Sequence, residues 1–229
     1  ALYQKVVLAV VPKLNALALA RIASLVAVSS LQQGGTVEES KTLLEELLAK
    51  LKEEDGESDA AAATAADSSP NSVPTALFLQ SKIALLTLTQ PTTPPTAADL
   101  VSIYSVIKAN SPLLNQVMSD TPEAIIVHSS HYEMSMLYYK LVGPPEAYYD
   151  EAMHYLNYYQ PGPDDGPKSH ALAVDLCLAA LTGEGVYNLG QVVTNPILRV
   201  LRDTPDGWLV ELLQACSKGS VSEFHKLRK

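Results

Sequence analysis

Apolar residues along much of this chain recur every three or four positions, which is the spacing of one face of an α-helix. The clearest stripe is followed by lysines and preceded by glutamates, an order of charge that complements the helix dipole. Its apolar members are Leu43, Leu44, Leu47, Leu48 and Leu51. A second helical stripe lies within residues 14–31, and Gly34-Gly35 ends it. Residues 1–53 are therefore predicted to contain an antiparallel helix pair, whose second helix starts at a capping box formed by Thr36 and Glu39.

Turn signals divide most of the remaining chain into further helix-sized segments. Helices are predicted over residues 76–88, from 96 to about 111, over 122–141 and over 146–159. Pro112 is predicted to interrupt or end the second of these, because proline lacks the amide that a helix interior needs.

The last third of the chain holds shorter apolar segments. They cover residues 171–181, 187–193, 197–201 and 207–216, and a final segment runs from 220 to 229. Ser220 and Glu223 form a capping-box pattern at the start of that final segment. Stacked helix pairs are the arrangement that this spacing predicts.

The pattern as a whole predicts an all-α fold. No stretch alternates apolar and polar residues over enough positions to indicate a convincing strand. Helices joined by short turns favour an α-solenoid, in which each antiparallel helix pair covers the apolar face of the next. The tetratricopeptide consensus does not recur, so the repeat is predicted to be structural rather than sequential.

Residues 54–74 differ from the segments on either side. An acidic run leads into an Ala/Ser/Asp tract and then into Ser69-Pro70-Asn71. Few large apolar side chains are present to offset the entropy of ordering the backbone. The tract is predicted to be a mobile acidic insertion.

The net charge of the chain argues against two classes of binding partner, nucleic acids and anionic membranes. The 16 Lys and Arg residues against 25 Asp and Glu give a formal net charge of −9. Nucleic-acid binding requires a basic surface to neutralise phosphates, and an anionic membrane likewise attracts cations. Neither a nucleic acid nor a membrane is therefore an expected partner.

The N-terminal apolar run resembles a signal peptide, and residues 14–31 resemble a membrane span. Asn15, Arg21 and several serines interrupt the second segment, however, and a spanning helix requires about 20 mostly apolar residues. The chain is therefore predicted to contain neither a signal peptide nor a membrane-spanning helix. Cys177 and Cys216 lie within apolar helix patterns and are expected to be buried thiols, although spacing alone leaves a disulfide open.

His128 and His131 form the best candidate metal site. Side chains three positions apart share a helix face, so two imidazoles could approach one ion, with Glu133 and His154 completing the site. This pattern makes a metal-dependent enzyme the alternative hypothesis of a different class. The favoured interpretation is that both histidines are packing or surface residues, because no cysteine lies nearby and no H-E-x-x-H motif is present.

Residues 183–190, Gly-Glu-Gly-Val-Tyr-Asn-Leu-Gly, partly resemble a dinucleotide-binding loop. The third glycine is two places late, and the segment follows a predicted helix where that fingerprint follows a strand. A helix C-cap and tight turn is the favoured interpretation. No catalytic constellation was found, so the chain is predicted to be no enzyme and to need no cofactor.

Eight of the tyrosines cluster between residues 132 and 159. Their helical spacing favours rings packed between helices, with hydroxyl groups that reach a partner or water. A protein-binding face is the alternative for these rings, and the same two interpretations apply to Trp208.

Three stretches of the chain resemble the PCI-domain subunits of the proteasome regulatory-particle lid. The first covers residues 178–190 and continues through Asn195-Pro196-Ile197-Leu198 to Trp208-Leu209. The second covers residues 127–152 with its paired tyrosines, and the third covers 219–227. The resemblance gives a structural role to Gly183, Glu184, Gly185, Asn188, Gly190, Pro196 and Trp208.

This resemblance implies a right-handed stack of helix pairs, TPR-like, over residues 1–170. It also implies that residues 171–229 are the helical start of a PCI module, with the winged helix absent. The implied function is a non-catalytic scaffold of the lid, located in the cytoplasm and nucleus and acting in ubiquitin-dependent proteolysis. Its expected partners are other lid subunits, including PCI neighbours, the deubiquitinase module and the adjacent ubiquitin receptor. A subunit of the COP9 signalosome or of a translation-initiation scaffold is the alternative.

Overall fold

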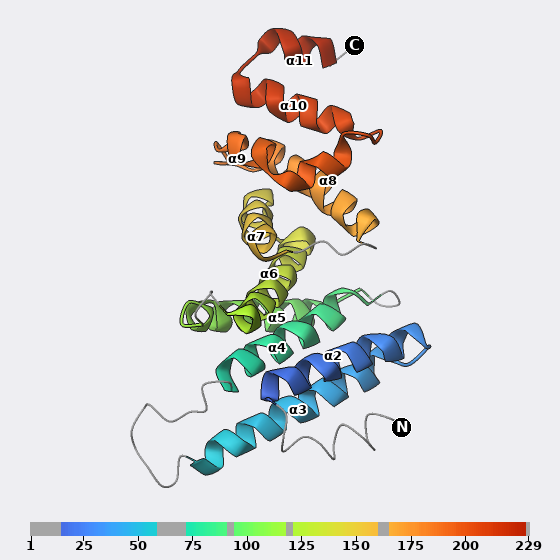
Figure 1. Cartoon of the computed structure of the whole chain (residues 1–229), viewed down its shortest axis with the longest axis vertical. Coiled ribbons are helices and arrows are strands. Elements are labelled where there is room, and N and C mark those ends of the chain that lie inside the picture. The colour runs from blue at the N-terminus through green and yellow to red at the C-terminus, as the bar shows by residue number, and fades with distance from the viewer. Residues whose placement is uncertain (1–14, 59–71, 91–93, 118–120, 160–164, 228–229) are drawn as a thin grey trace. The chain divides into compact units, whose positions relative to one another are not determined.

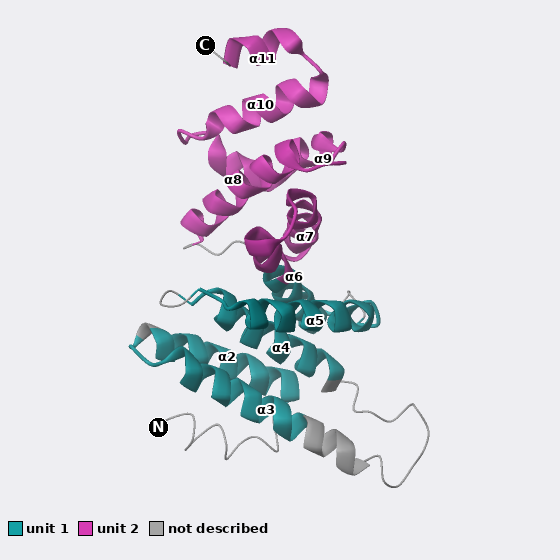
Figure 2. Cartoon of the chain, turned by 180° about the vertical axis from the view of Figure 1, so that it is seen from behind, with its two compact units in different colours: residues 1–134 teal, residues 135–229 magenta. Residues whose placement is uncertain are grey.

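A computed structural model describes residues 15–58, 72–90, 94–117, 121–159 and 165–227. Every regular element within these ranges is a helix, and none of them is a strand, which confirms the predicted all-α fold. Contacts divide the chain into two compact units, residues 1–134 and 135–229 (Figure 2). The boundary predicted at 170/171 divides helical repeats from the start of a PCI module, which is a different division from one based on contacts. That boundary stays a prediction.

Unit 1 is built from helices that pack mainly on their neighbours in sequence (Figure 1). Helices α2, α3 and α4 pack on one another, and α5 packs on α4. These helices are α2 (Ala16–Gln32), α3 (Val37–Ser58), α4 (Ser72–Leu88), α5 (Ala97–Leu114) and the first part of α6 (Pro122–Val142). The helix pair predicted for residues 1–53 is α2 with α3.

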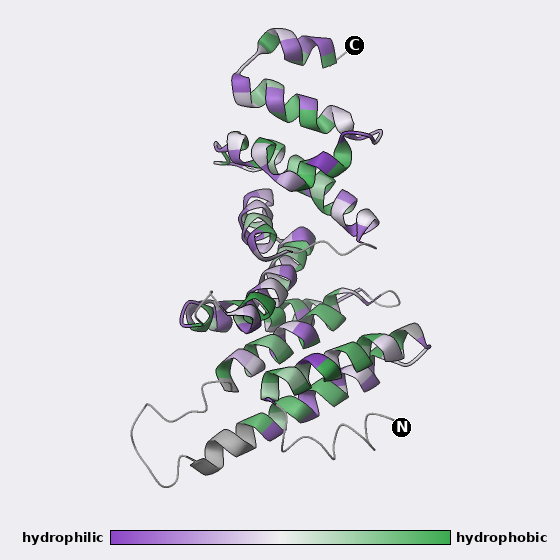
Figure 3. Ribbon diagram, in the orientation of Figure 1, coloured by the Kyte–Doolittle hydropathy of each residue, from purple (hydrophilic) through white to green (hydrophobic). Residues whose placement is uncertain are grey.

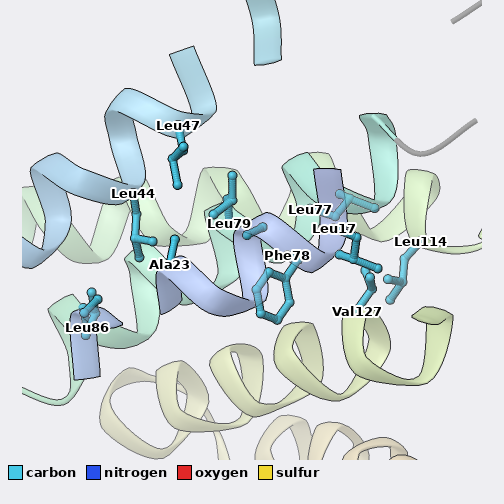
Figure 4. Packing of buried hydrophobic residues seen from close by; sticks show 12 residues of the cluster. Leu17, Ala23, Leu44, Leu47, Leu77, Phe78, Leu79, Leu86, Leu114 and Val127 are labelled. Atoms are coloured by element: carbon cyan, nitrogen blue, oxygen red, sulfur yellow. The ribbon is translucent and has the colours of Figure 1, made fainter. Parts of the chain in front are cut away.

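The core of unit 1 combines small residues of α2 with leucines of α3 and α4. Ala20, Ala23 and Ala27 lie on one face of α2 and are at most 2% exposed, so the neighbouring helices approach closely. Leu44 of α3 and Leu79 of α4 are fully buried against this face (Figure 4). Hydrophobic residues run along all three helices (Figure 3). Burial of each leucine contributes about 1.5–3 kcal/mol.

A complete capping box starts α5. The amide of Asp99 donates to the Thr96 hydroxyl oxygen at 3.3 Å, and the Thr96 amide donates to the Asp99 carboxylate at 3.0 Å. The hydrogen bond from the Thr96 hydroxyl is the main cause that lowers the pKa of the Asp99 carboxyl, and the bond from the Thr96 amide adds to it. At Thr36 and at Ser220 the structure shows one half of the predicted box, the bond from the amide three residues later.

Pro112 does not end α5, contrary to the prediction, because the helix continues to Leu114. The bond that proline cannot make would have reached the carbonyl of Lys108, on an exposed residue where water can replace the lost donor. A proline so close to the C-terminal end of α5 therefore has little effect on the stability of the helix.

The limits of the acidic insertion also differ from the prediction. Helix α3 continues to Ser58 and α4 begins at Ser72, so both helices extend into the tract predicted to be mobile. Glutamate is a good helix former, which favours the extension of α3. Pro74 lies in the first turn of α4, where backbone amides have no partner within the helix. The rest of the predicted insertion, 59–71, lies outside the described residues.

Unit 2 also consists of helices that pack on one another in succession. Helix α8 packs on α7 and on the η3 turn, and α10 packs on α8, α9 and α11. These elements are α7 (Pro145–Tyr158), α8 (Gly166–Thr182), α9 (Leu189–Thr194), the 3₁₀ helix η3 (Pro196–Leu201), α10 (Gly207–Lys218) and α11 (Val221–Leu227). The helix predicted at 187–193 thus begins two residues later, and the one at 197–201 is a 3₁₀ turn.

The tyrosines of unit 2 mostly pack inside it, as predicted. Tyr148, Tyr149 and Tyr155 are at most 6% exposed on α7. The Tyr159 and Ser169 hydroxyl oxygens lie 2.9 Å apart and join the end of α7 to the start of α8. Burial raises the pKa of the Tyr148 phenol far above its usual value, with a smaller contribution from the Asp175 carboxylate.

The two cysteines differ from each other in environment. Cys177 is fully buried, and burial raises the pKa of its thiol to about 12. Cys216 is exposed on α10, contrary to the prediction, because its neighbour Ala215 takes the buried face. Both thiols are free.

No helix in the described ranges is both long enough and apolar enough to cross a membrane.

Candidate functional site

The connection between α8 and α9, residues 183–190, carries the strongest resemblance and lies at the surface of unit 2. Glu184, Gly185 and Asn188 are exposed, and the Tyr187 side chain is 93% exposed. Single exposed hydrophobic side chains are common at protein surfaces, so this exposure alone does not mark a partner site. Tyr187 lies outside the tyrosine cluster of residues 132–159, but the sequence did not indicate that its ring is exposed to solvent.

Gly183 closes α8 at a point of close backbone packing. Its amide donates to the carbonyl of Ala179 at 2.8 Å. A Cβ atom there would lie 2.8 Å from that carbonyl oxygen, 2.8 Å from Cγ2 of Val186 and 3.2 Å from the backbone nitrogen of Glu146. The absence of a side chain at Gly183 thus lets the end of α8 pack on the start of α7.

The other two glycines of this connection have different surroundings. Gly185 has a φ of +83°, a left-handed conformation that favours glycine. Gly190 lies in α9 with open space around it. Glycine is therefore required by packing at 183 and by backbone conformation at 185, and neither reason applies at 190.

We expect Gly183→Ala to lower the free energy of unfolding of unit 2 by about 1–3 kcal/mol, because the new methyl group overlaps backbone atoms. Gly190→Ala is the matched control and should be neutral or stabilising by up to about 1 kcal/mol, since alanine favours a helix. Urea denaturation followed by circular dichroism measures both. Equal effects of the two substitutions would show that the close contact at Gly183 has no energetic role.

The remaining residues of the resemblance lie near the ends of short elements. Asn188 precedes α9 without a side-chain capping bond. Pro196 occupies the first position of η3, and Asn195 caps that turn by accepting from the Ile197 amide at 3.1 Å. Trp208, in the first turn of α10, is 51% exposed. The structural role assigned to the set stays a prediction.

The candidate metal pair lies inside unit 1. His128 and His131 are 5% and 2% exposed on α6. Nε2 of His128 lies 3.3 Å from the Val117 carbonyl oxygen, and the ring of His131 packs edge-on against Tyr132 with centroids 5.6 Å apart. Burial, followed by the nearby His128, lowers the pKa of His131 to about 4.

The described residues contain no group of three His, Cys, Asp or Glu side chains arranged to hold a metal. Glu133 was one of the two residues expected to complete the site. Its carboxylate Oε2 instead lies 3.6 Å from Nζ of Lys82 on α4. The favoured interpretation of the two histidines, packing within a helical layer, agrees with their burial.

The fold and this surface define a helical-repeat protein with an exposed, glycine-containing connection. Among known protein families, the model for PSD13 N-terminal repeats matches residues 1–213. Because the match covers most of the chain, the chain belongs to the PSD13 N-terminal repeat family.

Curated relatives in several organisms are named as 26S proteasome regulatory subunits. The chain is 35% identical over 102 residues to the 26S proteasome non-ATPase regulatory subunit 13 of Dictyostelium discoideum, which covers 44% of the chain and 26% of the relative. It is 28% identical over 150 residues to homolog B of that subunit in Arabidopsis thaliana, covering 66% and 36%. It is 29% identical over 105 residues to the 26S proteasome regulatory subunit RPN9 of Saccharomyces cerevisiae, covering 45% and 27%. The aligned parts span between 26% and 36% of each relative's length.

Proposed function

We propose that this chain is part of a non-catalytic scaffold subunit of the 26S proteasome regulatory-particle lid. The family match over residues 1–213 carries the proposal, since relatives of this family are 26S proteasome regulatory subunits. The helical stack is consistent with it, because packed helix pairs present rigid faces to neighbouring proteins. Proposed partners are other lid subunits, including PCI neighbours, the deubiquitinase module and the adjacent ubiquitin receptor, in the cytoplasm and nucleus.

Affinity purification of the protein with an epitope tag, from cells that express it at its native level, tests the proposal. Lid subunits should be recovered in stoichiometric amounts, as quantified by mass spectrometry, and the protein should co-sediment with the regulatory particle. Recovery of COP9 signalosome or translation-initiation subunits in their place would contradict the proposal. Absence of the protein from purified regulatory particles would also contradict it.

The non-catalytic part of the proposal has its own test. Purified protein should hydrolyse neither a fluorogenic ubiquitin substrate nor ATP above the rate of a buffer blank. Turnover that scales with protein concentration and survives repeated purification would show that the subunit is an enzyme.

A further inference from the structure

Helices α4 and α5 of unit 1 leave a groove between them. One hollow of about 350 Å³ lies between the start of α4 and the end of α5, and a second of about 370 Å³ lies between the end of α4, the start of α5 and α3. Both hollows are lined by Gln80 and Val106, so they are consecutive parts of one groove, here called the α4–α5 groove. Its lining on α5 extends from Asp99 to Leu113, which corresponds to about 21 Å along a helix axis.

The first hollow combines an apolar rim with a buried amide. Val73 and Leu113 line it and are 38% and 37% exposed. Small residues such as Ala76 and Ala109 leave room between the helices. Asn110 also lines the hollow and is 2% exposed, and its Nδ2 has no hydrogen-bond partner among the residues that the structure describes. A buried polar group without a partner is unfavourable, so an acceptor supplied by a ligand would stabilise the bound state.

The chemistry of Asn110 favours one form of ligand. The terminal torsion of asparagine has a broad energy profile, so the carboxamide can turn its N–H toward the groove. A carboxamide is complementary to a peptide group, and Gln80 places a second one in the middle of the groove. In a helical ligand the backbone carbonyls are already bonded within the helix, whereas an extended peptide presents them to its receptor.

Charge at the other end of the groove favours a basic side chain. Glu45 and Asp99 line the second hollow together with Lys41, whose ammonium also lies 3.6 Å from the Glu38 carboxylate. Carboxylates are therefore in excess at this end. A Lys or Arg of a ligand would find a complementary charge there, whereas an acidic residue would be repelled.

We propose that the α4–α5 groove binds an extended peptide segment of a partner protein. A backbone carbonyl of that segment accepts from the Asn110 amide, and a Lys or Arg side chain lies beside Glu45 and Asp99. About six extended residues span the groove, at about 3.3 Å each. Peptide binding does not require the chain to be part of a lid. The result of the binding experiment is therefore independent of the proposed function.

Fluorescence anisotropy with the full 229-residue chain tests this proposal. The probes are two labelled hexapeptides of alternating alanine and valine, one with a lysine at its N-terminal end and one with a lysine at its C-terminal end. In two further peptides a glutamate replaces the lysine. At least one lysine peptide should bind saturably, and its glutamate counterpart about tenfold more weakly, a difference of about 1.4 kcal/mol. Absence of saturable binding, or equal affinity for the two charges, would overturn the proposal.

Variants locate the peptide in the groove. Ala109→Trp fills the space between the helices from an exposed position and should abolish binding, whereas Ala98→Trp, exposed on the same helix outside the groove, should not change it. Asn110→Ala should weaken binding about tenfold, with Asn115→Ala as the matched control. Circular dichroism confirms folding, and Ala109→Trp keeps the test decisive if Asn110→Ala unfolds.

Two further outcomes separate the alternatives. Glu45→Gln should weaken binding of the lysine peptide and reduce its dependence on salt, because one attractive charge is lost. A concentration-dependent dimer that Ala109→Trp abolishes, in sedimentation experiments without peptide, would assign the groove to a second copy of the chain and overturn the proposal.

Discussion

Replacement of Leu44 by alanine is expected to lower the free energy of unfolding of unit 1 by about 2–5 kcal/mol. Leu44 is 0% exposed in α3 and belongs to the cluster that joins α2, α3 and α4, where it lies near Ala23 (Figure 4). The loss includes both the transfer of the removed methyl groups and the cavity that they leave. Rigid helices packed through small alanines have little freedom to collapse into that cavity.

Urea denaturation measured by circular dichroism provides the test, with Leu25→Ala as its control. Leu25 lies in α2, whose opposite face packs against α3, but its side chain is 67% exposed. The same chemical change there should alter stability by no more than about 0.5 kcal/mol. Similar losses at Leu44 and Leu25 would contradict the described packing of these two helices.

Acidification is expected to destabilise unit 1 through His131. Its folded-state pKa, about 4, lies below the 6.5 of an unperturbed imidazole, because burial and the neighbouring His128 disfavour the charged form. Between pH 6.5 and about pH 4 the unfolded chain therefore binds a proton that the folded chain does not. The contribution of His131 to stability is constant above pH 7, falls by about 2 kcal/mol between pH 7 and pH 5, and is about 3 kcal/mol lower at pH 4 and below.

The variant His131→Phe isolates this effect, because it keeps an aromatic ring in the buried position without a titrating group. Its stability should depend less on pH between 7 and 5 than that of the wild type, by about 2 kcal/mol. His225→Phe, at an exposed position of α11, should retain the wild-type dependence. Glu151 acts in the opposite direction, since burial raises its carboxyl pKa, so the difference between variants is the decisive quantity. Parallel pH profiles for wild type and His131→Phe would rule out the buried imidazole as the cause.

Much of the secondary structure could be predicted from local patterns. The stripe from Leu43 to Leu51 indicated α3, and the turn signals at Gly34 and Gly183 fall at the ends of helices. The errors are also local in character. Helix α3 continues into an acidic tract of good helix formers, and Pro112 is tolerated within the last turn of α5.

The candidate site was only partly accessible to sequence reasoning. Residues 183–190 were identified from a family resemblance and from their position after a helix, and the family model supports that resemblance. Their spacing could not show that a side chain at Gly183 would meet the backbone of Glu146, because these two residues are distant in the chain. The exposure of Tyr187 likewise depends on how the connection leaves α8.

The sequence by itself determined the helices, their order and the family, because a helical stripe and its caps depend on residues within a few positions of one another. The tertiary structure decided which face each helix buries. It placed His128 and His131 inside unit 1, turned Cys216 outward and left the α4–α5 groove open. Burial and close approach arise from contacts between helices, and these depend on loop geometry and on the combined shapes of several side chains, which no local pattern records.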